Sequence, residues 1–153
     1  MNDLELKIPP PILVLIISAL MWFVSENLPA LSFTLPGSQL FGLALAGTGI
    51  LFSLAGIIAF RKAETTVNPT KPGNTSAMVT SGVYRLSRNP MYLGLLFVLA
   101  GWAAVLSHML AFLFLPVFVA YLNRFQITPE ERVLSVKFGE AFAAYTHVVR
   151  KWL

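Results

Sequence analysis

Residues 91–125 read MYLGLLFVLAGWAAVLSHMLAFLFLPVFVAYLNRF. This stretch holds two almost wholly apolar segments, 91–107 and 109–125, which meet at Ser107 and His108. A transmembrane helix needs about 17–25 predominantly apolar residues to cross the roughly 30 Å hydrocarbon core of a bilayer. Both segments reach the short end of this range, so the stretch predicts two membrane-spanning helices joined as a tight hairpin.

Two more apolar segments, about 8–28 and 40–60, precede this hairpin. The chain of 153 residues is 56% hydrophobic and 12% charged, which is roughly half the charge of a soluble domain. Asp3 and Glu5 precede the first segment and no small-residue cleavage motif follows it, so we expect a retained helix and not a signal peptide. The sequence therefore predicts one all-α integral membrane domain, residues 1–153, with about four transmembrane helices.

The segment 40–60 is rich in small residues, among them Gly42, Gly47, Gly49 and Gly56. In membranes, small residues let the backbones of two helices approach each other closely. We therefore expect this segment to pack tightly on a neighbouring helix.

Most basic residues fall in two regions, the loop 61–90 and the tail 126–153 with the adjoining Arg124. Four spans place both regions on one side of the membrane, and the positive-inside rule makes that side cytoplasmic. We expect a multi-pass integral membrane protein, in the plasma or inner membrane if the source is bacterial, with membrane lipids around it. A basic soluble face, cysteines and metal-ligand spacing are all missing, so we expect neither a nucleic-acid partner nor a metal.

The tail contains a fifth helical pattern. Thr128, Pro129 and Glu131 have the types and spacing of an N-cap, a first-turn proline and the acidic partner of a capping box. Apolar residues then recur at helical spacing over 134–149, with charged residues mostly on the other face. The pattern predicts an amphipathic cytoplasmic helix that begins after Thr128 and lies at the membrane surface or on the bundle.

Two polar stretches flank the hairpin, TSGVYRLSRNPMYLG at 80–94 and PEERVL at 129–134, and the second is followed by Phe138-Gly139-Glu140 and Tyr145. In this order and spacing they resemble the signatures of the isoprenylcysteine carboxyl methyltransferase family and of the broader group that includes phospholipid N-methyltransferases. The resemblance covers about residues 79–150. It departs from the family pattern at Asn89, where the family often has histidine, because asparagine forms hydrogen bonds but cannot carry a proton in catalysis.

This resemblance implies an S-adenosylmethionine-dependent methyltransferase whose cofactor binds in a cytoplasm-facing pocket between the last two spans and the tail. The implied acceptor is lipophilic, carries a carboxylate, amine or thiol group, and enters from the bilayer as a small molecule or a lipid-anchored one. The implied catalytic residues are Arg88 and Glu131. The residues implied for cofactor binding are Val79, Tyr84, Arg88, Asn89, Pro90, Tyr92, Gly94, Glu130, Glu131 and Leu134.

The residue types themselves are compatible with this chemistry. Asn89 and Pro90 are typical of a helix start, where unpaired amides and the neighbouring Arg88 suit the carboxylate of a cofactor. The rings of Tyr84 and Tyr92 suit a sulfonium cation. Plainer explanations remain open: a simple helix start, an arginine and tyrosines at the membrane edge, an acidic residue that only caps its helix, and a glycine that serves helix packing.

An acceptor that must lose a proton needs a base, and Glu130 and Glu131 are the nearest candidates. His108 lies at the hairpin tip, a membrane thickness from the basic loop, so we expect an interfacial histidine without a part in the chemistry. Two other functions stay open. One is an NADPH-dependent membrane reductase related to sterol reductases, whose much longer chains carry a similar Arg-His-Pro-x-Tyr stretch. The other is a non-catalytic membrane subunit with the same fold.

Overall fold

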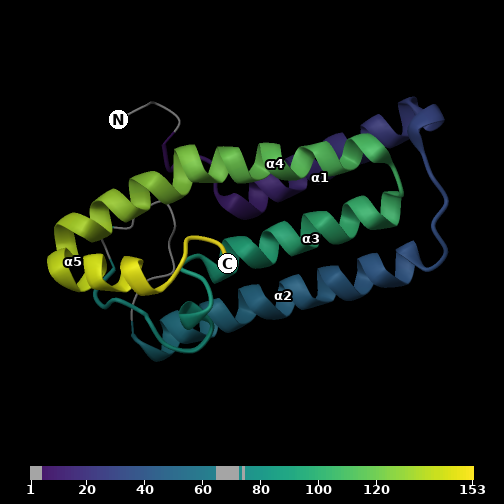
Figure 1. The fold of residues 1–153 in the computed structure, drawn as a ribbon. Helices are drawn as coiled ribbons and strands as arrows, with labels where there is room; N and C mark the ends of the chain where they lie inside the picture. The colour runs from purple at the N-terminus through teal and green to yellow at the C-terminus, as the bar shows by residue number, and fades with distance from the viewer. Residues whose placement is uncertain (1–4, 65–72, 74) are drawn as a thin grey trace.

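The structure is a computed structural model that describes residues 5–64, 73 and 75–153. Within those ranges every regular element is a helix, and a single isolated bridge joins Ser32 to His108. The long helices are α1 (Pro10–Asn27), α2 (Ser38–Lys62), α3 (Pro90–Leu106), α4 (Met109–Leu122) and α5 (Thr128–Val148) (Figure 1). Short helical turns connect them: η1 (Pro29–Leu31), η3 (Gly82–Arg85) and η4 (Asn123–Ile127). Part of the expected loop 61–90, including the basic Lys71, lies outside the described ranges.

Three helical segments are long and apolar enough to cross a membrane: α1, α2 and the continuous run Met109–Val148 that contains α4. Several charged side chains interrupt α5, so we place the membrane-crossing part of that run in α4. α3 is also apolar but has only 17 residues, at the short end of the spanning range. The all-helical membrane architecture is confirmed with three spans, while the fourth span remains a prediction.

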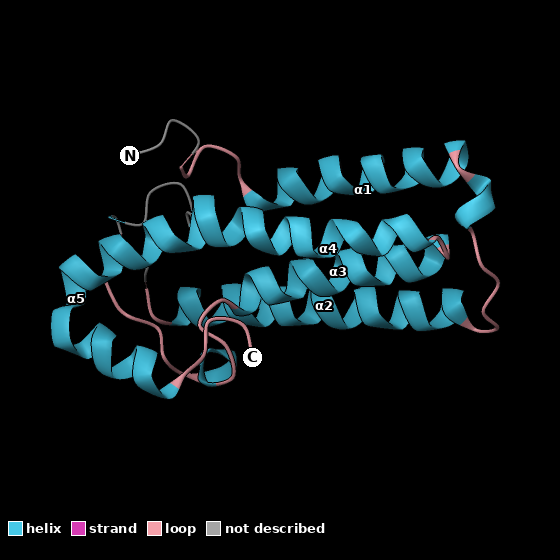
Figure 2. Ribbon diagram, turned by 45° about the horizontal axis from the view of Figure 1, so that its top comes forward, coloured by secondary structure: helices cyan, strands magenta, loops and turns pink. Residues whose placement is uncertain are grey.

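α3 lies at the centre of the bundle, with α2 antiparallel beside it and α1 packed on both α3 and α4 (Figures 1 and 2). The buried residues of α1 include Leu13, Ile17 and Met21, which lie about one helical turn apart and face this core. The other side of α1 exposes large apolar side chains such as Leu15 and Trp22. A helix that is apolar all round is typical of a membrane span, where its outer face contacts lipid.

The residues that α2 buries are all glycines and lie seven positions apart: Gly42, Gly49 and Gly56. Gly42 packs on Gly101 of α3, and Gly49 packs on Gly94 of α3, so closely that an added Cβ would collide with the facing backbone. The tight packing expected for this segment is therefore confirmed. Gly47 is the exception, because an added Cβ there has no neighbour within 4 Å.

α5 does not begin at an N-cap. Thr128 has helical backbone angles (φ −60°, ψ −45°), and its Oγ1 donates to the carbonyl of Asn123 at 2.7 Å. The π-helical turn η4 carries the chain from α4 into α5 without a break, and no side chain caps α5. The expected N-cap at Thr128 and its capping box with Glu131 are wrong, because a continuous helix has no free N-terminal amides to satisfy at that point.

α5 breaks at Gly139, whose backbone angles (φ 50°, ψ −124°) are not helical. These are the angles of the first central residue of a type II′ turn, which glycine adopts readily because it has no Cβ. Beyond the break the chain turns back, so that residues 146–151 lie beside the start of α3 (Figures 1 and 2). The expectation of a single amphipathic tail helix is wrong in this respect: the tail forms two helical pieces.

His108 lies in the hairpin between α3 and α4, as expected, but its side chain is completely buried. Its Nε2 is 2.9 Å from the carbonyl oxygen of Leu28, and the amide of Phe33 donates to the carbonyl of Ser107 at 2.9 Å. The connection between α1 and α2 folds over the hairpin and covers this side chain. We call the end of the bundle that holds His108 the hairpin end. We call the opposite end, which holds Arg88 and the tail, the basic end.

Candidate functional site

Three separate parts of the chain meet at the basic end. They are the start of α3 with η3 before it, the junction of η4 with α5, and the C-terminal residues beyond Gly139 (Figure 1). They meet through polar side chains, most of which are buried or half-buried, whereas the core between α1, α3 and α4 consists mostly of apolar side chains. A buried polar cluster at one end of an apolar bundle is the candidate functional site.

Arg88, just before α3, forms the central contact of this site. Its Nε and Nη2 donate to Oε1 of Glu131 at 3.1 and 2.8 Å. Its Nη1 donates to the carbonyls of Thr146 and Val149 at 3.2 and 2.8 Å. Lys151 adds an ion pair to the other oxygen of Glu131 at 3.2 Å. Arg88 thus ties the start of α3 to both halves of α5, and these contacts use four of the five N–H donors of its guanidinium group.

Asn89 is the N-cap residue of α3, with Pro90 at the first helical position, as expected. Its side chain does not cap the helix, however. Nδ2 of Asn89 donates to the carbonyl of Lys151 at 3.0 Å, and the amide of Arg88 donates to the carbonyl of Arg150 at 2.9 Å. The position that the family often fills with histidine therefore holds the C-terminal residues in place, and no side chain caps the first turn of α3.

Glu130 belongs to a second group of polar residues, next to the contacts of Arg88. The hydroxyl of Tyr92 donates to Oε1 of Glu130 at 2.6 Å, and Nε2 of Gln126 donates to the same oxygen at 2.5 Å. Tyr92 is 6% exposed and Gln126 is 2% exposed. We call Glu130, Tyr92 and Gln126 the inner cluster; its members come from α5, α3 and η4.

Burial raises the pKa of Glu130 from its ordinary value of 4.5 to about 7, and the hydrogen bonds from Tyr92 and Gln126 oppose part of this rise. The carboxyl group therefore gains and loses its proton close to neutral pH. A carboxyl group with this property is suited to act as a general base or acid.

Tyr84, in η3, is buried next to the inner cluster. Its ring centroid is 5.3 Å from that of Phe60, and its carbonyl accepts a hydrogen bond from the hydroxyl of Tyr145 at 2.7 Å. Burial, with the nearby Tyr145 and Glu130, raises the pKa of Tyr84, so its hydroxyl stays neutral. That hydroxyl has no hydrogen-bond partner among the described residues. Because a buried hydroxyl without a partner costs about 1–3 kcal/mol, it is a natural contact for a bound ligand.

Most of the implied site residues gather at the basic end: Tyr84, Arg88, Asn89, Pro90, Tyr92, Glu130 and Glu131. Val79 is buried and Leu134 is half-buried, and their part in the site stays a prediction. Gly94 is different. An added Cβ there would collide with Gly49 and Ser53 of α2, so helix packing already accounts for this glycine.

Gln126 was not predicted from the sequence, although one signal for it exists. It is a polar residue at the end of an apolar segment, four positions before Glu130, which places the two side chains on one helix face. No sequence signal marks residues 146–151 as part of the site, because most of their contacts use backbone carbonyl groups, which every residue carries.

The groups at the basic end suit an organic ligand. They offer a carboxylate, phenol hydroxyls, aromatic rings and an amide within one cluster. In the part of the chain that the structure describes, no three histidine, aspartate or glutamate side chains lie close enough together to hold a metal ion.

Comparison with known proteins identifies the family of the chain. An uncharacterised protein of Haemophilus influenzae is 43% identical over 63 residues, which are 41% of this chain and 100% of that protein. No solved structure matches the chain significantly. Residues 38–141 match the family model described as phospholipid methyltransferase, and this range runs from the start of α2 past Gly139. Because the match covers more than half of the chain and includes both Arg88 and Glu130, the protein belongs to the phospholipid methyltransferase family of membrane methyltransferases, part of the broader group that its two motifs resemble.

Proposed function

We propose that this protein transfers a methyl group from S-adenosylmethionine to a lipophilic acceptor at the basic end, and that this end faces the cytoplasm. The observation that carries the proposal is the contact of 2.6 Å between the hydroxyl of Tyr92 and the carboxylate of Glu130, next to a core that consists mostly of apolar side chains. Burying polar and charged groups costs free energy, and groups with shifted pKa values cluster at functional sites.

The residues at the basic end fit the proposed cofactor. The rings of Tyr84 and Tyr92 suit a sulfonium, and the unpartnered hydroxyl of Tyr84 suits a polar group of the ligand. The first turn of α3, which no side chain caps, suits a carboxylate. When bound, S-adenosylmethionine supplies a methyl group on a positively charged sulfur, which leaves as a neutral thioether.

We assign Arg88 and Glu131 a positioning role in place of the direct catalytic role that the resemblance implied. Four of the five N–H groups of Arg88 are already bonded to Glu131, Thr146 and Val149. The pair therefore holds the start of α3 and the C-terminal residues in the arrangement that surrounds the inner cluster.

Glu130 is the group that we expect to accept a proton. An amine, hydroxyl or thiol acceptor loses a proton as its lone pair forms the bond to the methyl carbon, and a carboxyl group that titrates near neutral pH can take this proton. A carboxylate acceptor has no proton to lose and would not need Glu130 for this step. The acceptor reaches the site from the bilayer, along the apolar outer faces of the helices.

Calorimetry on the purified full chain in detergent tests the cofactor. We expect binding of S-adenosylmethionine and S-adenosylhomocysteine, and none of NADPH. Glu130→Gln keeps the size of the side chain but removes its charge, and we expect it to weaken cofactor binding by about tenfold, or about 1.4 kcal/mol. Glu140→Gln is the matched control, because Glu140 is exposed on the same helix and should leave binding unchanged.

The other outcomes of this titration are informative. Failure of a folded wild-type protein to bind S-adenosylmethionine would contradict the proposal. Binding of NADPH in its place would favour a reductase, and binding of neither would favour a non-catalytic subunit. Transfer of a labelled methyl group into a membrane lipid extract then identifies the class of acceptor.

A further inference from the structure

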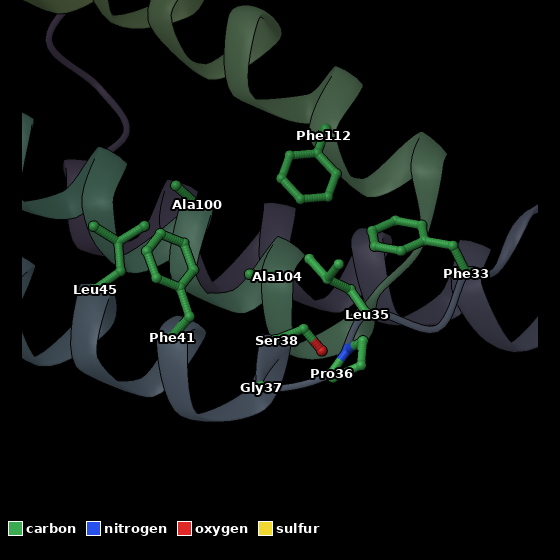
Figure 3. Close-up of a pocket in the computed structure, with 10 residues that line it drawn as sticks. All are labelled: Phe33, Leu35, Pro36, Gly37, Ser38, Phe41, Leu45, Ala100, Ala104 and Phe112. Carbon is green, nitrogen blue, oxygen red and sulfur yellow. The ribbon is translucent and has the colours of Figure 1, made fainter.

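A cavity of about 410 Å³ lies at the hairpin end, remote from the inner cluster (Figure 3). Its walls come from the connection before α2, the first turns of α2, the last turns of α3 and the first turn of α4. Ala100 and Ala104 line it on α3. Ala100 lies ten residues after Pro90, so the cavity is roughly 15 Å along α3 from the start of that helix.

The lining of the cavity suits an apolar ligand. Aromatic rings of Phe33, Phe41 and Phe112 are arranged around it, and none of the described residues that line it is charged (Figure 3). Its polar side chain, Ser38, already shares a hydrogen bond of 2.9 Å with Ser107. A ligand with a polar group inside the cavity would therefore leave that group without a partner, which is costly.

The helix packing around the cavity keeps it open. Gly42 and Gly101 hold α2 and α3 at the closest approach that glycines allow, so α3 cannot move further toward α2 to fill the space. Ala100 and Ala104 lie one helical turn apart on α3, and their short side chains leave space beside the contact between Gly42 and Gly101. The connection before α2 is fixed as well, through the hydrogen bond from the amide of Phe33 to Ser107.

The cavity is continuous with the lipid-facing surface of the bundle. Phe41 and Leu35, which line it, are 63% and 61% exposed, and Leu40 and Met109 beside them are also exposed. In a membrane these side chains contact the hydrocarbon of the leaflet at the hairpin end. The side chains that line an empty apolar cavity lack van der Waals contacts on the side that faces the cavity. An acyl chain from the surrounding lipid supplies these contacts.

We propose that this cavity is a binding site for one acyl chain of a bilayer lipid from the leaflet at the hairpin end, separate from the methyl-transfer site. The lipid headgroup lies at the level of Ser38 and Ser107, and the acyl chain lies along Ala104 and Ala100. The site is independent of the proposed function, because it shares no residue with the inner cluster.

Photolabelling tests this site. The full chain is reconstituted into vesicles that contain a phosphatidylcholine with a photoreactive acyl chain, and the labelled peptides are identified by mass spectrometry. We expect labelling around Phe41 and Phe112 to exceed labelling around Leu15, which is 70% exposed on α1. Ala100→Phe fills the cavity and should lower the labelling at Phe41 and Phe112 by about tenfold, equivalent to about 1.4 kcal/mol. Ala44→Phe makes the same change on an exposed face of α2 and should not lower it.

A second variant keeps the test valid if Ala100→Phe fails to fold. Phe112→Ala widens the cavity and should raise the labelling at Phe41. Labelling that does not respond to either cavity variant would overturn the proposal. Loss of labelled methyl transfer into a lipid extract in Ala100→Phe, with S-adenosylmethionine binding intact, would also overturn it, because the cavity would then hold the acceptor.

Discussion

Tyr92, in the first turn of α3, donates its hydroxyl proton to a hydrogen bond with Glu130, in the first turn of α5, with 2.6 Å between the two oxygen atoms. Gln126 of the π-helical turn η4 donates to the same carboxylate oxygen. The contact therefore joins the central helix of the bundle to the junction where the chain leaves the membrane. Packing and the proposed chemistry both depend on it.

Tyr92→Phe removes the hydroxyl and leaves the Glu130 carboxylate with one donor fewer. We expect the free energy of unfolding to fall by about 1–3 kcal/mol, because a buried hydrogen bond to a charged group is lost. Denaturant unfolding of the detergent-solubilised protein measures this change. Tyr121→Phe is the control, because the buried Tyr121 hydroxyl has no partner among the described residues and its removal should leave the free energy of unfolding unchanged or higher. Equal losses in the two variants would contradict a role for the Tyr92–Glu130 contact.

The pKa of Glu130 predicts a pH dependence of stability. Since burial raises this pKa from 4.5 to about 7, the folded protein still binds a proton at pH values where the unfolded chain has released it. The stability contributed by this proton is complete below about pH 4.5 and is lost as the pH rises to about 7. We expect Glu130→Gln to remove this dependence, so that its stability relative to the wild type increases across that window. Glu140→Gln, on an exposed carboxyl group, should follow the wild type, and a Glu130→Gln curve parallel to the wild type would contradict the assignment.

The sequence predicts the long apolar helices within about two residues at most ends, because a membrane span is set by its length and apolarity. It also predicts that the small residues of α2 pack closely on a neighbouring helix, but not that Gly42, Gly49 and Gly56 are the ones that α2 buries. It does not predict the junction at Thr128. The pattern Thr-Pro-Glu-Glu is typical of a helix start, but in the structure a π-helical turn precedes Thr128 and keeps the helical backbone continuous.

Tertiary contacts decide the details of the site that the sequence leaves open. The resemblance implies both Arg88 and Glu131, but the further hydrogen bonds from Arg88 to the carbonyls of Thr146 and Val149 depend on the turn at Gly139, which brings the C-terminal residues back to α3. Asn89 was predicted as a capping residue, and it holds the carbonyl of Lys151 instead. A sequence pattern describes neighbours along one helix, whereas these contacts of Arg88 and Asn89 join residues more than 40 positions apart.

Arg88→Lys should release the C-terminal residues from α3. A lysine has one nitrogen and cannot reach Glu131, Thr146 and Val149 together, whereas the planar guanidinium group does so. We expect faster amide hydrogen exchange over residues 146–151 and a free energy of unfolding lower by about 1–3 kcal/mol. Arg85→Lys is the control, because Arg85 is exposed in η3. Unchanged exchange over residues 146–151 in Arg88→Lys would show that other contacts hold this segment.

Gly94→Ala tests one of the close contacts between α2 and α3. The added methyl group would collide with Gly49 and Ser53, so the helices must separate. We expect the free energy of unfolding to fall by about 1–3 kcal/mol, as in other overpacked cores. Gly47→Ala is a matched control, because the new methyl group meets nothing within 4 Å and alanine favours the helix by up to about 1 kcal/mol. The two substitutions should therefore change stability in opposite directions in the same denaturant titration, and a Gly94→Ala protein as stable as Gly47→Ala would contradict the glycine contact.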